Sequence, residues 1–181
     1  MRLKLIIAVS AISTIAIITS NNVAAQPYGA GTYNSTTPYG GETSLSISTA
    51  SAVNFTINPA SNGAFSSASG AVTVYSTDVS GYKLYIRAIG TSAMTMPGST
   101  IPASANATPA ALGLNTWGYN TTGSTTLFTG VTTTDSLLKN ASGPYSAGDA
   151  TTVTYGLNLD LSKPAGSYAA NLVYTAVPQT N

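Results

Sequence analysis

A two-residue alternation of apolar and polar side chains constrains this chain more than any other feature. It is clearest in one run, in which Tyr82, Leu84, Ile86 and Ala88 alternate with Lys83, Tyr85 and Arg87. Because successive side chains of a β-strand point to opposite faces, this period predicts a half-buried strand. No stretch of ten residues has the apolar period of a capped amphipathic helix. The sequence therefore predicts an all-β protein.

The same period predicts further strands before and after this run. They are the runs at 45–47, 53–57, 70–76, 115–120 and 125–131. About seven to nine short strands separated by turn residues are typical of two packed antiparallel sheets. We therefore predict an antiparallel β-sandwich of Greek-key or immunoglobulin-like type. A jelly roll or a barrel is the nearest alternative.

The last third of the chain has the most regular alternation. Residues 153–161 and 168–177 both alternate, and the turn sequence SKPAG lies between them. Proline and glycine suit a turn because one fixes the backbone angle and the other permits a positive one. We expect a long antiparallel hairpin here. Its second strand is apolar on both faces, which predicts a place inside a sheet.

Two segments lose the alternation. Residues 90–114 contain Pro97, Pro102 and Pro109 among small residues, and residues 132–148 are also irregular. A loop of about 25 residues is long for a compact domain, and such loops are usually either functional or without fixed structure. Within the first segment, the sequence ASANATPAALG predicts one short helical turn.

The N-terminal residues have the pattern of an export signal. A positively charged start precedes an apolar run over 5–18, and Val23 and Ala25 occupy the −3 and −1 positions of a small-residue cleavage site. We predict cleavage after Ala25. The alternative is a retained membrane anchor, but the run is shorter than the roughly 20 apolar residues that span a bilayer. The exported chain is thus predicted to have no membrane span.

This signal sets the predicted domain organisation. Residues 1–25 are the signal peptide, 26–41 an N-terminal arm, 42–178 one β-sandwich domain and 179–181 a tail. Cleavage leaves 156 residues, which is enough for a single domain. The arm is rich in Gly, Pro, Ser and Thr, so we expect a flexible linker. The alternative is that the arm pairs with an edge strand of a neighbouring molecule.

Charged side chains make up only 6% of the sequence, against about a quarter in a typical soluble domain. Loss of Arg2 and Lys4 with the signal leaves four basic residues against five acidic ones. Nucleic-acid binding depends on clustered Lys and Arg, so the sequence excludes that class of protein. The polar faces of the predicted strands are built from Thr, Ser, Asn and Gly instead.

The residue types that most catalytic and metal sites need are scarce. The absence of Cys and His removes disulfides together with the commonest general base and metal ligand. No two acids are spaced like the facing carboxylates of a glycosidase, and none belongs to a calcium loop. Asp78 and Asp149 are predicted in turns, and Asp160 with Lys163 forms at most a surface ion pair. We predict no enzymatic activity, no catalytic or metal site and no cofactor.

Three motifs carry a resemblance to a known family. They are GYKLYI at 81–86, NTWGY at 115–119 and the pair GDATTVTYG and KPAGSY within 148–168. In this order they resemble a domain common in secreted and surface proteins of Saccharibacteria and other small ultra-reduced bacteria, over about Leu45 to Val177. The resemblance implies a cell-surface β-sandwich.

The chain is also similar, more distantly, to the WxL surface domains of Gram-positive bacteria. It departs from their motif because Trp117 is followed by Gly118 and Tyr119 rather than by one residue and Leu. The peptidoglycan binding associated with WxL domains is therefore not carried over to this chain.

The only tryptophan has two interpretations. A strand over NTWGY places Trp117 and Tyr119 on one face and Gly118 on the other. Buried aromatic side chains each cover about 150–250 Å², so we favour the indole as a core residue, with Gly118 marking a close backbone approach. Alternatively, Trp117 faces solvent with Tyr119 or Tyr85 nearby and stacks on a sugar ring.

These observations predict an exported bacterial protein of the cell surface or envelope with a structural or assembly role. We expect it to pair with itself or with another envelope protein through edge strands that charge does not guard. The alternative is an adhesin or glycan-binding module that uses the 90–114 loop and the nearby aromatic residues. A hydrolase is the least favoured function.

Overall fold

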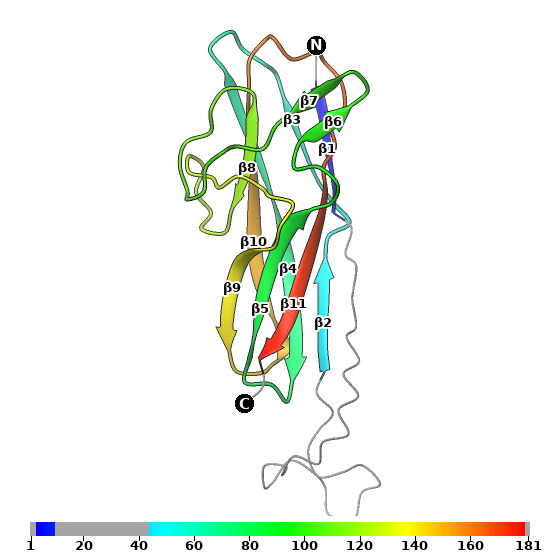
Figure 1. The fold of residues 1–181 in the computed structure, drawn as a ribbon, viewed down its shortest axis with the longest axis vertical. Coiled ribbons are helices and arrows are strands. Elements are labelled where there is room, and N and C mark those ends of the chain that lie inside the picture. The colour runs from blue at the N-terminus through cyan, green and yellow to red at the C-terminus, as the bar shows by residue number, and fades with distance from the viewer. Residues whose placement is uncertain (1–2, 10–43, 180–181) are drawn as a thin grey trace, which may run out of the picture.

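The computed structural model describes residues 44–179 in full and residues 3–9 by their backbone (Figure 1). All regular structure in these ranges is β-strand. One sheet has the strand order β3-β1-β11-β5-β9, a second has the order β2-β4-β10-β8, and β6 and β7 form a small ribbon. Every strand pairing is antiparallel except that of β1 with β11. The prediction of an all-β protein with antiparallel sheets is confirmed.

The elements divide among the sheets as follows. The five-stranded sheet contains β1 (Leu3–Val9), β3 (Ala52–Ile57), β5 (Gly81–Ala88), β9 (Ser136–Ser142) and β11 (Asn171–Gln179). The four-stranded sheet contains β2 (Ser44–Thr49), β4 (Ala64–Thr77), β8 (Thr116–Asn120) and β10 (Tyr145–Leu159). The ribbon is β6 (Met94–Met96) with β7 (Ser99–Ile101). Figure 1 shows the strands of both larger sheets running along the long axis of the molecule.

Strand β5 shows how the alternation places side chains. Tyr82, Leu84, Ile86 and Ala88 are buried, and the three residues between them are half-buried. The same pattern buries Val53, Phe55 and Ile57 on β3 and Val72, Val74 and Ser76 on β4. The strands predicted at 45–47, 53–57, 70–76 and 115–120 are confirmed as β2, β3, the second half of β4 and β8.

The predicted hairpin at the end of the chain is wrong. Residues 153–159 belong to β10 in the four-stranded sheet, whereas β11 lies in the five-stranded sheet between β1 and β5. Strand β10 pairs with β4 along one edge and with β8 along the other, so no edge remains for β11. The chain crosses between the sheets after Leu159. The predicted place of the last strand inside a sheet is confirmed.

Other local predictions also need correction. The segment 132–148 contains β9 and the start of β10, and β9 lacks alternation because its register with β5 shifts at Leu138, between Leu137 and Lys139. Residues 125–131 form isolated bridges, Phe128 with Ala110 and Thr129 with Tyr119, rather than a strand. The 90–114 loop holds the β6-β7 ribbon and no helical turn.

Buried side chains of both larger sheets form one hydrophobic core. Its largest fully buried members are aromatic: Trp117, Tyr82, Tyr155, Tyr168 and Tyr174. A buried phenol needs a hydrogen-bond partner inside the protein. Tyr168 donates to Ser99 at 2.9 Å, and the hydroxyls of Tyr155 and Tyr174 bond each other. The core therefore holds polar groups as well as apolar surface.

The five-stranded sheet includes part of the predicted signal peptide. Strand β1 lies between β3 and β11, antiparallel to the first and parallel to the second. The predicted cleavage site after Ala25 and the arm 26–41 lie outside the described residues. At the other end of the chain, β11 extends to Gln179, and the rest of the predicted tail lies outside them too.

Candidate functional site

Trp117 lies in the core with no exposed surface. Its indole Nε1 donates a hydrogen bond to the carbonyl oxygen of Ser92 at 3.0 Å. Its backbone also bonds Pro102 and Ser104, at 3.3 and 2.7 Å. All three partners belong to the 90–114 loop, so this residue ties the loop to β8. An indole without exposed surface presents no face for a sugar to stack on.

Gly118 shows the close backbone approach that the sequence predicts. A Cβ atom at this position would lie 2.5 Å from the carbonyl oxygen of Thr129. Thr129 exchanges backbone hydrogen bonds with Tyr119, at 2.9 and 2.8 Å. The absence of a side chain at Gly118 therefore lets the segment around Thr129 lie against β8.

Tyr119 lies on the same strand and is 6% exposed. Burial raises the pKa of its phenol, and an interaction with the Ser136 hydroxyl opposes the rise. Tyr85 is half-buried on β5, in the other large sheet. The structure thus places Trp117 and Tyr119 on one strand and Tyr85 on the opposite sheet.

A cleft of about 340 Å³ lies between β8 and β9, the edge strands of the two larger sheets. Its walls include Tyr119 and Asn120 from β8, Ser136 and Leu137 from β9, and Ala107 and Pro109 from the 90–114 loop. Tyr85 does not line it. The cleft combines hydroxyl and amide groups with an aromatic edge, a surface suited to a neutral, hydroxylated ligand.

Asn120 is a nearly buried residue that lines this cleft. Its side chain is 3% exposed, and its Nδ2 donates to the carbonyl oxygens of Ser124 and Leu127 at 2.8 and 3.1 Å. Its Oδ1 is buried and has no hydrogen-bond partner. A buried acceptor of this kind commonly bonds an ordered water molecule. Sequence reasoning missed this residue because an Asn at a strand end resembles any other turn residue.

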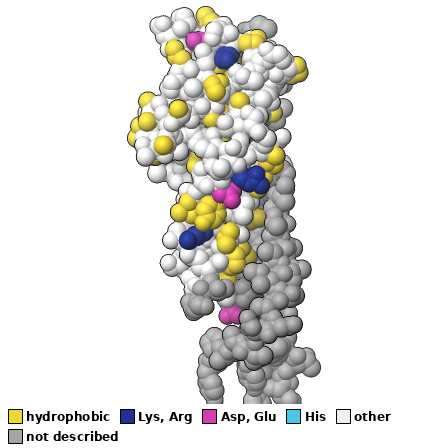
Figure 2. Space-filling model, in the orientation of Figure 1, with side chains coloured by type: hydrophobic (Ala, Val, Ile, Leu, Met, Phe, Trp, Pro, Cys, Tyr) yellow, Lys and Arg dark blue, Asp and Glu magenta, His cyan; other side chains and the backbone are white. Residues whose placement is uncertain are grey.

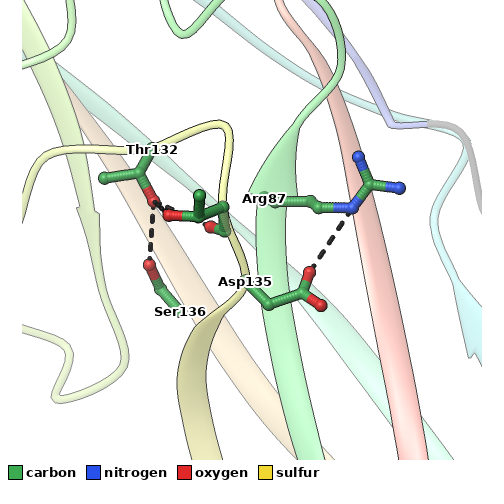
Figure 3. A network of polar contacts seen from close by, with 5 residues as sticks. Arg87, Thr132, Asp135 and Ser136 are labelled. Atoms are coloured by element: carbon green, nitrogen blue, oxygen red, sulfur yellow. Dashed lines mark hydrogen bonds and ion pairs between the residues drawn. The ribbon is translucent and has the colours of Figure 1, made fainter.

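The wall formed by β9 is anchored by the polar network in Figure 3. The Thr132 hydroxyl donates to the carbonyl oxygen of Thr134 at 2.8 Å and lies 3.1 Å from the Ser136 hydroxyl. Arg87 Nε lies 3.4 Å from Asp135 Oδ1, and both side chains are largely exposed. An exposed pair of this kind contributes under about 1 kcal/mol. The network fixes the start of β9 against β5.

A second polar group links the two large sheets. Tyr82 on β5 donates to Asp149 Oδ2 at 2.8 Å, and Lys139 on β9 donates to Asp149 Oδ1 at 2.6 Å. Burial, and then the bond to Asp149, raise the pKa of Tyr82. The predicted turn position of Asp149 is therefore wrong, because this residue lies in β10 after the irregularity at Gly148. Asp78 does lie in a bend, with φ of 53°.

Among residues 44–179, no three potential metal ligands cluster. Asp160 accepts hydrogen bonds from the backbone and hydroxyl of Ser162, at 2.8 and 2.6 Å, which lower the pKa of its carboxyl group. Lys163 donates to the carbonyl oxygen of Thr100 at 2.8 Å, and its charge makes a smaller contribution to the lowered pKa of Asp160.

The edges of the two large sheets are nearly free of charge. The edge strands are β3, β9, β2 and β8, and Lys139 is the only charged residue in their sequences. Lys139 is paired with Asp149. In Figure 2, charged side chains are few and scattered on the face shown. The usual protection of sheet edges by unpaired charge is therefore missing from these strands.

Within the described ranges, no helix has the length and apolar character needed to cross a membrane. Comparison with protein-family models, with curated proteins and with solved structures found no match for this chain.

Proposed function

We propose that this chain is an exported bacterial protein of the cell surface or envelope, with a structural or assembly role and without catalytic activity. The predicted signal peptide supports export, and the resemblance to surface domains of Saccharibacteria supports the location. The proposal includes cleavage after Ala25. It also includes the finer fold assignment, a Greek-key or immunoglobulin-like sandwich, with a jelly roll or barrel as the alternative.

The observation that carries the assembly role is the uncharged character of the sheet edges. An edge strand offers unpaired N–H and C=O groups to any extended segment. Soluble monomers commonly block such edges with unpaired charged residues, and β2 and β3 contain none. The edge of β8 is instead covered by backbone bonds to Pro102, Ser104 and Thr129. The Leu137 side chain on β9 is 53% exposed. The edges of β2, β3 and β9 favour pairing with a second copy or with another envelope protein.

Sizing of the exported protein tests this role. The mature chain, purified with and without residues 26–41, is passed over a sizing column with light scattering. We expect oligomers from the full mature chain. Strictly monomeric behaviour of both forms at all concentrations would refute self-assembly. Cell fractionation then tests the location, with the protein expected in the envelope fraction.

The cleft beside Tyr119 supports a second candidate function, binding of a glycan. The supporting observation is the lining of the cleft, in which hydroxyl and amide side chains lie beside the ring of Tyr119. Calorimetric titration with soluble cell-wall and host oligosaccharides tests it. Asn120→Leu should abolish binding, and Leu161→Ala, which changes an exposed residue outside the cleft, should not. A wild-type chain that binds none of these sugars would remove this candidate.

A further inference from the structure

Strand β1 occupies an internal position in the five-stranded sheet. It pairs with β3 over six residues, from Leu3 opposite Ile57 to Ala8 opposite Ala52. On its other side it pairs with the start of β11, Ala8 with Asn171 and Val9 with Leu172. Strand β1 therefore pairs the backbone of β3 over its whole length and that of β11 at its first two residues. Its removal would open two edges that face each other.

Strand β3 depends on this position for its backbone pairing. Within residues 44–179 it has no other ladder partner, and its contact with β4 includes a side-chain bond from Ser66 to the carbonyl oxygen of Thr56, at 3.0 Å. Its buried residues Val53, Phe55 and Ile57 stand opposite Ile7, Leu5 and Leu3 in the register. The position next to β3 thus takes an extended segment of six residues.

The predicted cleavage after Ala25 removes this strand from the exported chain. We infer that the gap between β3 and β11 is then a strand-accepting slot, which is filled by the arm 26–41 of a second copy. This inference rests on the proposed export and assembly, and it names the surface and the partner. Backbone hydrogen bonds to both edges would supply the affinity, as in other cases of strand addition.

The arm is long enough for this role. Pro27 and Pro38 enclose ten residues without proline, Tyr28–Thr37, and the slot needs six. Proline would interrupt a ladder because it has no N–H group. Thr and Tyr, which occur five times in this run, suit an extended strand. The run carries no charge, so its insertion buries none.

The uncharged sheet edges favour a second copy, although residues 38–43 are long enough to reach the slot of the arm's own domain. The arm joins the sheet at Ser44, and all of β2 lies between that point and β3. At about 3.3 Å per residue, the six residues of β2 separate the arm from the slot by roughly 20 Å. In Figure 1, β2 begins near the C-terminal end and β1 lies toward the opposite end. Copies joined in this way form a head-to-tail contact, which extends into a filament unless it closes into a ring.

Engineered cysteines test the slot directly, because the chain has none of its own. One variant carries Asn54→Cys, an exposed position on β3 that stands opposite Ile6 of β1. Partner variants carry Tyr33→Cys or Asn34→Cys in the arm, so that both faces of the inserted strand are sampled. Controls replace Asn54→Cys by Ser46→Cys on β2 or by Leu137→Cys on β9, two exposed positions on other edges. All variants are exported from the full precursor and are mixed in pairs under mild oxidation.

We expect disulfide-linked dimers between Asn54→Cys and one of the arm variants, and none with the two controls. Oligomers that cross-link only at Ser46→Cys or Leu137→Cys would refute the slot and leave assembly in place. A double variant that forms its disulfide within a monomer would show that the arm fills its own domain, which overturns the second-copy contact. If mass spectrometry finds Leu3–Val9 in the exported protein, β1 is retained and the position between β3 and β11 is not vacant, which would refute the inference. Monomers throughout would refute the proposed function itself.

Discussion

At the residue scale, the buried tyrosines Tyr155 and Tyr174 make the stability of this core depend on pH. Tyr155 and Tyr174 bond each other, and burial is the main cause that raises the pKa of both, for Tyr174 to about 12. A phenol in the unfolded chain has a pKa of about 10. Between these values the folded state keeps a proton that the unfolded state releases. Stability is therefore complete below about pH 10 and is lost as the pH rises toward 12.

Replacement of these phenols should weaken that pH dependence. In Tyr174→Phe, and more so in the double variant with Tyr155→Phe, the free energy of unfolding should fall less steeply between pH 9 and about 11.5. Urea titrations followed by circular dichroism at several pH values measure the slope. Leu161→Ala is the control and should keep the slope of the natural chain. An unchanged slope in the double variant would contradict the assignment.

The burial of Trp117 could be predicted from the sequence, and the polar partners of the core could not. A single large aromatic on an alternating strand of a small domain is most often buried. The partner of its Nε1, Ser92, lies 25 residues away in a loop without periodicity. Likewise, nothing local marks Asp149 as the acceptor for Tyr82. Such pairs depend on which sheets face each other, and alternation does not encode that arrangement.

At the scale of elements, Asp149 connects three strands of two sheets. It accepts from Tyr82 on β5 and from Lys139 on β9 while it lies on β10. Its side chain is 15% exposed, whereas Asp135 in the pair with Arg87 is 49% exposed. The two aspartates thus allow a comparison of an ion pair that joins the two sheets, Lys139 with Asp149, with an exposed ion pair, Arg87 with Asp135.

Asp149→Asn should cost about 1.5–3 kcal/mol of unfolding free energy, because two bonds to a charged acceptor weaken in a partly buried place. Asp135→Asn should cost under about 1 kcal/mol, because its pair is exposed to solvent. Urea denaturation of both variants at neutral pH measures the two losses. Equal losses would show that Asp149 does not connect the sheets energetically.

The strands themselves were largely predictable, and their neighbours were not. Alternation located β3 and β5 because each has one buried face, and β2 because one of its faces is half-buried. It missed β9, whose leucines are exposed or half-buried at a sheet edge. It also paired β10 with β11 across a short turn, although β10 already has a neighbour on each side. Sheet order is a tertiary property, and a short connection between two alternating runs did not determine it.

For the whole molecule, the scarcity of charge predicts how assembly depends on salt. The mature chain is predicted to carry four basic and five acidic residues, and the slot and the arm segment 28–37 have no charged residue. Contacts made by backbone hydrogen bonds and apolar side chains are little affected by ionic screening. The oligomer distribution on a sizing column should therefore be the same at low and at high sodium chloride. Dissociation as salt rises would point to charged contacts instead.

The direction of the strands has a mechanical consequence. Strand β2 pairs with β4 over six residues along the long axis of the molecule (Figure 1). Tension applied at Ser44 along that axis loads all the hydrogen bonds between β2 and β4 at once, in shear. Tension perpendicular to that axis would break the same hydrogen bonds one after another, at a lower force. In a filament of such domains, tension along the filament would thus act in the direction in which each domain best resists unfolding.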